Sequence, residues 1–139
     1  MIALDTDVLS LILVGNGGYV SRLNELPPDE VCVTVVALEE AMRGRLDGIR
    51  KAQQSDRAGA LAAAYERFQQ GFTDLRAYRV LPYTAAAHEL FLAWRAGKIR
   101  VGTQDLRVAA ICVAHDADLV SRNRRDFNRV PALKLTVWN

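Results

Sequence analysis

The chain has 139 residues, of which half are hydrophobic and 24% are charged. This composition is typical of a globular protein and excludes a disordered one. No apolar run approaches the roughly 18 residues of a membrane-spanning helix, and no signal-peptide pattern opens the chain. We therefore expect a single domain over residues 1–139, with no membrane partner and a cytoplasmic location.

The cysteines and histidines do not indicate a metal site. Cys32 lies in the apolar run VCVTVV and Cys112 in AAICVA, so both are expected to be buried, reduced thiols. The two histidines, His88 and His115, do not complete a zinc-ligand pattern with the two cysteines, which argues against zinc. His88 is expected to be structural or exposed.

Charge is distributed unevenly along the chain. Residues 1–42 carry seven acidic side chains and one basic one, a net charge of −6, whereas residues 43–139 carry 17 basic and nine acidic ones, a net charge of +8. Fifteen of the 18 basic residues are arginine, the side chain that pairs best with phosphate. A GC-rich genome and an ordinary solvated surface would produce the same pattern, so both interpretations stay open.

The first half of the chain predicts strands that run directly into helices. A short strand at residues 2–5 is followed at once by a helix that ends before the GNGG stretch. A second helix at 19–26 stops at a proline pair. The β-branched run VCVTV (31–35) predicts a strand that is covered on both faces, and the pattern ALEEAMRGRL then predicts a helix.

The second half continues the alternation. Residues 50–75 are rich in helix signals, and one apolar stripe in them is expected to pack into the core: Leu61, Tyr65, Phe68 and Phe72. The remaining predicted elements are strands at 77–83, 117–121 and 133–138 and helices at 84–97 and 103–114. Strands that alternate with helices predict a parallel α/β sheet with helices on both faces.

Acidic residues recur at one edge of this predicted sheet. Ligands of parallel sheets bind beyond the carboxyl ends of the strands. Asp5 ends the first strand, and Glu39 and Glu40 lie in the first turns of the helix that follows Thr34. Asp105 opens a later helix, and Asp126 follows the fourth strand. Asp5 alone could be a helix cap, but the convergence favours a shared site.

Carboxylates that lie this close together repel one another, and a divalent cation removes the conflict. A set of oxygen ligands without histidine or cysteine favours Mg²⁺, with Mn²⁺ as the other option. Such an ion suits metal-assisted hydrolysis of a phosphodiester bond. The basic remainder of the chain would hold the polyanion.

Three stretches, spread over residues 2–138, resemble PIN-domain ribonucleases and especially the VapC-type toxins of bacterial toxin–antitoxin pairs. They are ALDTDVLS, VTVVALEEAMRG and GTQDLRVAAICVAHDADLVSRNRRDFNRVPALKLTVW. Each one is weak alone, but the ordered set is specific. The resemblance implies a PIN-like three-layer α/β fold with a mostly parallel central sheet flanked by helices. It also implies a Mg²⁺-dependent endoribonuclease that acts as the toxin of such a pair.

The resemblance also implies roles for individual residues. Asp5 and Asp105 match metal-binding positions and, with Glu40, are the candidate catalytic residues. Glu39 remains an alternative to Glu40, although Glu40 better fits the spacing to Thr34. Four supporting positions match as well: Thr6, Ser121, Asn123 and Asp126. Many relatives carry aspartate where this chain has Asn123, so one metal ion is the safer expectation than two. Asp7 is expected to start the helix.

Partners follow from the same resemblance. RNA is the expected substrate, and five arginines are candidates to contact its backbone: Arg100, Arg107, Arg122, Arg124 and Arg125. We expect a cognate antitoxin that docks a helix in an apolar groove near residues 36–75. We also expect a homodimer, with the alanines of the 50–75 region and Phe91 or Trp94 partly exposed. The alternatives are a catalytically weak PIN domain that binds RNA or protein, and a response-regulator receiver, which AYRVLPYT disfavours because it offers no aspartate.

Overall fold

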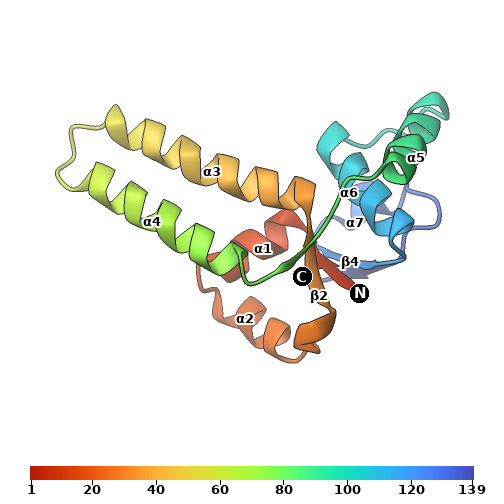
Figure 1. Cartoon of the computed structure of the whole chain (residues 1–139), viewed down its shortest axis with the longest axis horizontal. Coiled ribbons are helices and arrows are strands. Elements are labelled where there is room, and N and C mark those ends of the chain that lie inside the picture. Colours follow the sequence, from red (N-terminus) through yellow and green to blue (C-terminus); the bar gives the residue numbers. More distant parts are fainter.

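The computed structural model describes residues 1–139 and contains one five-stranded parallel sheet with the strand order β3-β2-β1-β4-β5 (Figure 1). All four strand pairs are parallel. The strands are β1 (Ile2–Leu4), β2 (Val31–Thr34), β3 (Arg79–Leu81), β4 (Asp118–Ser121) and β5 (Leu135–Val137). Strand β1 is central and pairs with β2 and β4. The chain therefore leaves three neighbouring strands toward Asp5, Glu40 and Asn123.

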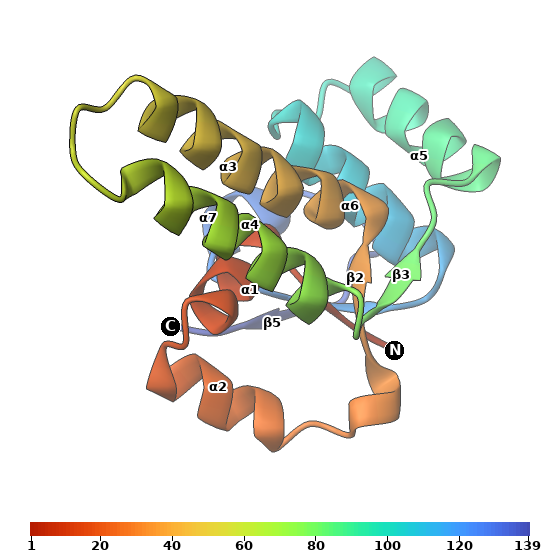
Figure 2. The same ribbon diagram turned by 60° about the vertical axis from the view of Figure 1, so that its left-hand side comes forward.

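Seven α-helices cover the two faces of the sheet. They are α1 (Thr6–Leu13), α2 (Gly17–Asn24), α3 (Val35–Gln53), α4 (Ala60–Leu75), α5 (Ala85–Ala96), α6 (Thr103–Ala114) and α7 (Arg124–Phe127). The ribbon views place α1, α2 and the α3–α4 pair on one face and α5, α6 and α7 on the other (Figures 1 and 2). The predicted three-layer α/β fold with a parallel sheet is confirmed.

Alternation along the strands builds a core on each face, because successive strand residues point to opposite sides. Ala3 belongs to a buried cluster that also contains Leu106 of α6, whereas its neighbour Leu4 belongs to a cluster with Val8 of α1. Cys32 and Cys112 are buried free thiols in the first cluster, as expected. None of the helices combines the length and apolar character needed to cross a membrane.

Helices start directly at the carboxyl ends of β1 and β2. Asp5 caps α1 by accepting a hydrogen bond from the backbone N–H of Thr6, and Thr34 caps α3 by accepting one from the N–H of Ala37 at 3.1 Å. A side chain that caps a helix satisfies a donor that the helix leaves free. The two caps fix the starts of α1 and α3 at one edge of the sheet.

The predicted elements exist, but their bounds differ. The strands are shorter than predicted, since Asp5 and Val35 already belong to helix starts. The helix after β2 continues to Gln53 as a single element, and α7 is a short helix that the sequence did not predict.

The expectation that the stripe of α4 packs into the core is wrong. Leu61, Tyr65 and Phe72 are 41%, 51% and 54% exposed. Helix α4 instead buries three of its small residues and Leu75: Ala60, Ala64, Gly71 and Leu75. The α3–α4 pair projects from the sheet as a long hairpin (Figures 1 and 2), so α4 has only α3 to pack against over much of its length. The expected partial exposure holds for Ala58, Ala62 and Phe91, whereas Ala60, Ala64 and Trp94 are buried.

Candidate metal centre

An open cleft of about 330 Å³ lies at the carboxyl edge of β1, β2 and β4. Its lining contains no hydrophobic residue and consists of Asp5, Thr6, Asp7, Glu40, Asp105 and Asn123. The structure thus brings together all three candidate catalytic residues and two of the four supporting ones. Asp7, which the sequence suggested only as a helix-starting residue, lines the cleft as well.

Asp5 is the most deeply buried carboxylate of the cleft, with 4% of its surface exposed. The backbone N–H of Thr6 donates to its Oδ1 at 2.8 Å, and the hydroxyl of Ser121 donates to its Oδ2 at 2.7 Å. The Ser121 hydroxyl in turn accepts the backbone N–H of Asn123 at 3.0 Å. Ser121 therefore supports Asp5 from behind without lining the cleft, and the carboxylate is held in one orientation.

Burial changes the protonation of this carboxylate. Desolvation raises the pKa of Asp5 from 3.8 to about 7, with the charges of Asp7 and Asp105 adding to the rise and the Ser121 hydrogen bond opposing it. Asp105 on α6 also has a raised pKa, caused first by burial and then by the charges of Glu40, Asp126 and Asp7. A bound cation would offset the burial and the negative charges that raise the pKa values of both carboxylates.

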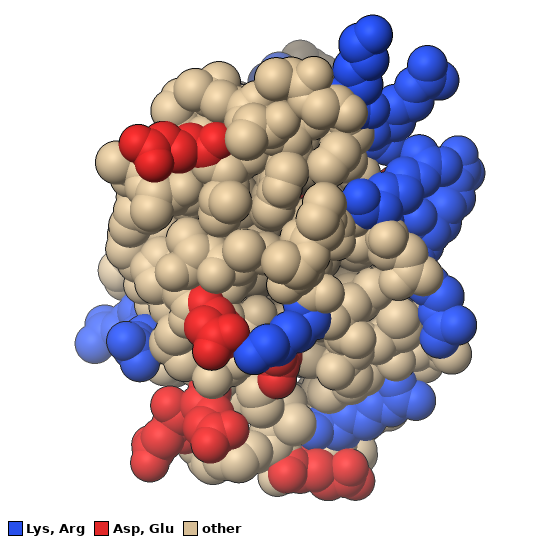
Figure 3. All heavy atoms as spheres, turned by 90° about the vertical axis from the view of Figure 1, so that its right-hand side faces the viewer, with Lys and Arg blue, Asp and Glu red and all other residues tan.

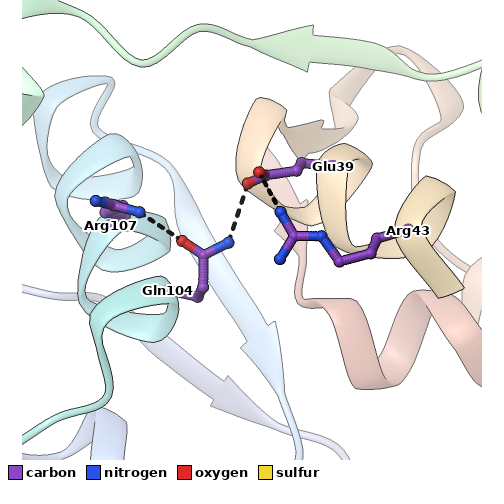
Figure 4. A network of polar contacts seen from close by, with 4 residues as sticks. All are labelled: Glu39, Arg43, Gln104 and Arg107. Carbon is purple, nitrogen blue, oxygen red and sulfur yellow. Dashed lines mark hydrogen bonds and ion pairs between the residues drawn. The ribbon is translucent and has the colours of Figure 1, made fainter.

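The two adjacent glutamates of α3 point to different places. Thr6 donates its hydroxyl hydrogen to Glu40 Oε1 at 2.7 Å, which ties Glu40 to the start of α1 inside the cleft. Glu39 instead accepts the side-chain amide of Gln104 at 3.0 Å and pairs with Arg43 at 2.7 Å (Figure 4). The geometry therefore puts Glu40, and not Glu39, beside Asp5.

Asn123 and Asp126 are tied to each other. Asn123 caps α7 by accepting the backbone N–H of Asp126 at 3.2 Å, and its side-chain amide donates to Asp126 Oδ2 at 3.0 Å. Arg125 lies 4.0 Å from Asp126 Oδ1. Asn123 lines the cleft, whereas Asp126 stands behind it and acts on the cleft through Asn123 and through its charge.

The donor chemistry of the cleft suits a hard divalent cation. Every side chain that lines it offers oxygen, which Mg²⁺ and Mn²⁺ prefer. No lysine or arginine forms an ion pair with Asp5, Asp7, Glu40 or Asp105. No three histidine, cysteine or acidic side chains converge on one metal position. Mg²⁺ usually binds through one or two carboxylates and keeps several waters, so the residues fit a single hydrated ion.

The candidate arginines form no ion pair with the acidic side chains that line the cleft. Arg107 of α6 donates to the side-chain oxygen of Gln104 at 2.8 Å (Figure 4). Four others lie at or near the surface: Arg100, Arg122, Arg124 and Arg125. Figure 3, which faces the side of the molecule that carries α5 and α6, shows most of the basic side chains along its right edge and most of the acidic ones in the lower half. An anionic strand could contact this basic edge.

Sequence reasoning missed Gln104, which joins α6 to α3 through Glu39. The one signal in the sequence was its position directly before Asp105. Sequence reasoning also assigned no functional role to Tyr83 and expected His88 to be structural or exposed. His88 is exposed, and both residues line a second hollow with Glu39 and Arg107. Their approach depends on how α5 and α6 pack, which no local motif encodes.

A groove of about 250 Å³ runs from the cleft between α1, α3 and α4. Its lining is Ser10, Leu13, Val14, Glu40, Ala41, Gly44, Arg45, Gly48, Ala64 and Arg67. Glu40 belongs to both the groove and the cleft. The groove lies in the region where the sequence predicted an apolar docking surface, although its lining is only partly apolar.

No family model and no curated protein matches the sequence. Solved structures, however, share its fold. VapBC2 from Rickettsia felis, bound to a promoter DNA fragment, matches with a TM-score of 0.75 and 20% identity, covering 100% of both chains. DNA-bound VapBC from Salmonella typhimurium matches with a TM-score of 0.76 and 20% identity over 99% of this chain and 98% of the other.

A toxin–antitoxin complex from Klebsiella pneumoniae matches with a TM-score of 0.72 and 19% identity, over 100% of this chain and 97% of the other. The PIN-like fold that the resemblance implied is thereby confirmed.

Proposed function

We propose that this protein is a Mg²⁺-dependent ribonuclease, with Mn²⁺ as a second competent ion, and that it hydrolyses RNA phosphodiester bonds as the toxin of a toxin–antitoxin pair. The observation that carries the proposal is the buried Asp5 carboxylate, which faces an all-oxygen cleft and has no basic partner. A fold shared with VapBC structures supports the assignment. An RNA target places the action in the cytoplasm.

Asp5 and Asp105 would hold the ion, with Glu40 beside them. A bound divalent ion supplies charge neutralisation at the phosphodiester and lowers the pKa of a coordinated water. The chain's own residues orient this centre: Ser121 and the Thr6 N–H fix the Asp5 carboxylate, and the Thr6 hydroxyl fixes Glu40. Because Asn123 carries no charge and is tied to Asp126, the proposal is a one-ion centre.

The partner proposal rests on the groove between α1, α3 and α4. A helix of a cognate antitoxin would lie in this groove, and a basic side chain of that helix would reach the cleft where Glu40 lines both. The exposed stripe of α4 and Val14, which is also exposed, supply apolar surface for contacts with the antitoxin or a second copy of the chain. We propose a homodimer on this basis.

The test is RNA cleavage by the purified chain with Mg²⁺, with Mn²⁺ and with EDTA. The proposal expects cleavage that EDTA abolishes and that both Asp5→Asn and Asp105→Asn remove, while far-UV circular dichroism stays unchanged. As a matched control, Asp47→Asn alters a half-exposed aspartate of α3 whose only ion pair is with Arg50, so it should cut normally. RNA binding without cleavage in any metal would identify the catalytically weak alternative.

A further inference from the structure

A second hollow, of about 320 Å³, lies beside the metal centre and is lined by Val35, Val36, Glu39, Tyr83, His88 and Arg107. It is close to the cleft because Glu39 precedes Glu40 on α3 and Arg107 follows Asp105 within one turn of α6. The hydrogen bond from Gln104 to Glu39 spans the two helices (Figure 4). The proposed hydrolysis does not use Tyr83 or His88.

One wall of this hollow is aromatic and internally braced. The Tyr83 hydroxyl and His88 Nδ1 are hydrogen-bonded at 2.9 Å, and their rings meet edge to face at 5.7 Å. The His88 ring stacks on Phe91, with centroids 6.1 Å apart and planes 15° apart. The guanidinium of Arg107 lies over the Phe91 ring of this stack, 5.5 Å from its centroid.

Another part of the lining is polar and hydrogen-bonded. Arg107 donates to Gln104, Gln104 donates to Glu39, and Glu39 pairs with Arg43 (Figure 4). Val35 and Val36 at the start of α3 add apolar surface. The hollow therefore combines a π-surface, a cation, a carboxylate acceptor and apolar surface, and hydrogen bonds or an ion pair connect its aromatic and polar side chains.

We propose that this hollow binds one nucleobase of a single-stranded RNA whose backbone crosses the metal centre. Aromatic side chains stack bases irrespective of sequence, and arginine binds the adjoining phosphate. Glu39 can accept hydrogen bonds from base N–H groups. The inference rests on the proposed ribonuclease function and extends it to substrate positioning: the base hollow would hold the strand while the cleft acts on a neighbouring phosphodiester.

The first test measures the affinity of a fluorescein-labelled single-stranded RNA by anisotropy in EDTA, so that cleavage plays no part. Tyr83→Ala should weaken binding about five- to a hundredfold, the range for loss of one stacked base. Tyr83→Phe keeps the ring and should stay within about twofold of wild type. Leu92→Ala, which removes an exposed apolar side chain from α5, the helix that also carries His88, is the matched control and should bind normally.

The second test is photo-crosslinking with an RNA that carries 5-iodouridine, followed by mass spectrometry of the peptides. Crosslinks at Tyr83 or His88, lost when unlabelled RNA competes, are the expected result. Crosslinks confined to other segments, or equal RNA affinity of folded Tyr83→Ala and wild type, would overturn the inference. So would a Tyr83→Ala variant whose only change is a weaker homodimer in light scattering, because that result makes the hollow a protein interface.

The two proposals fail separately. Tyr83-dependent RNA binding without Mg²⁺-dependent cleavage would refute the ribonuclease and leave the base hollow standing. Cleavage that depends on Asp5 and Asp105, together with RNA binding that does not depend on Tyr83, would refute the base hollow and leave the ribonuclease standing.

Discussion

Asp5→Asn should stabilise the metal-free protein at alkaline pH and at the same time remove its response to Mg²⁺. The wild-type carboxylate is buried, and burial raises its pKa to about 7. Asparagine has nearly the same shape and carries no charge. Its carbonyl oxygen can accept the Thr6 N–H, and its amide can donate to the Ser121 hydroxyl. The packing around the site therefore survives the substitution.

The magnitude follows from proton linkage. The unfolded chain releases the Asp5 proton near the ordinary pKa of 3.8, whereas the folded chain retains it to about 7. The stabilisation due to the protonated group is thus fully present below pH 3.8, falls as the pH rises through this window, and is lost above about 7. The shift corresponds to about 4 kcal/mol at about 1.36 kcal/mol per pKa unit. We expect Asp5→Asn to be more stable than wild type by about 2 to 4 kcal/mol at pH about 8, and to match it at pH about 4.

The assay is urea denaturation of both proteins across this pH range, in EDTA and in MgCl₂. At an ion concentration of about 100 times Kd, binding should raise the unfolding free energy of wild type by about 2.7 kcal/mol. The variant should gain far less, because it has no buried charge at this position. Parallel pH profiles of the two proteins in EDTA would refute the burial argument, and an equal Mg²⁺ gain would refute Asp5 as a metal ligand.

Three further outcomes are expected. Asp105→Asn should abolish metal-dependent cleavage with the fold intact, which a cleavage assay checks. It should stabilise the metal-free protein less than Asp5→Asn does, because Asp105 is only half-buried, and denaturation curves check this. Glu40→Gln should impair cleavage far more than Glu39→Gln, because Glu40 lines the cleft while a glutamine at 39 still reaches Gln104; the reverse order of the two rates would contradict the geometry. The third change replaces the arginines at and just before α7 with neutral residues: Arg122, Arg124 and Arg125. RNA affinity should fall evenly across sequences, and the log–log slope of affinity against salt concentration should fall by at most about one for each phosphate that is no longer neutralised. An unchanged slope would show that these arginines do not contact the RNA.

Local patterns in the chain were enough to predict the elements other than the short helix α7, and the edge at which the acidic residues meet. The β-branched run at β2 and the capping residues Asp5 and Thr34 are local signals, because strand burial and helix capping depend on neighbours in the chain. Parallel strands place their carboxyl ends together, so the convergence of Asp5, Glu40 and Asp105 was predictable before any coordinates. The resemblance to PIN domains added the PIN-like, three-layer fold, which the structure confirms.

What each helix face meets depends on packing between distant segments. The stripe of α4 is apolar in the sequence, yet Tyr65 and Phe72 are exposed because α4 packs its small residues on α3 and projects from the sheet. Periodicity identifies an apolar face but not the element that covers it. Glu39 and Glu40 are adjacent, and only the positions of Thr6 and Gln104, which come from α1 and α6, send one into the cleft and the other out of it. The hydrogen bonds that separate them join residues 34 and 65 positions apart, a distance over which no local pattern acts.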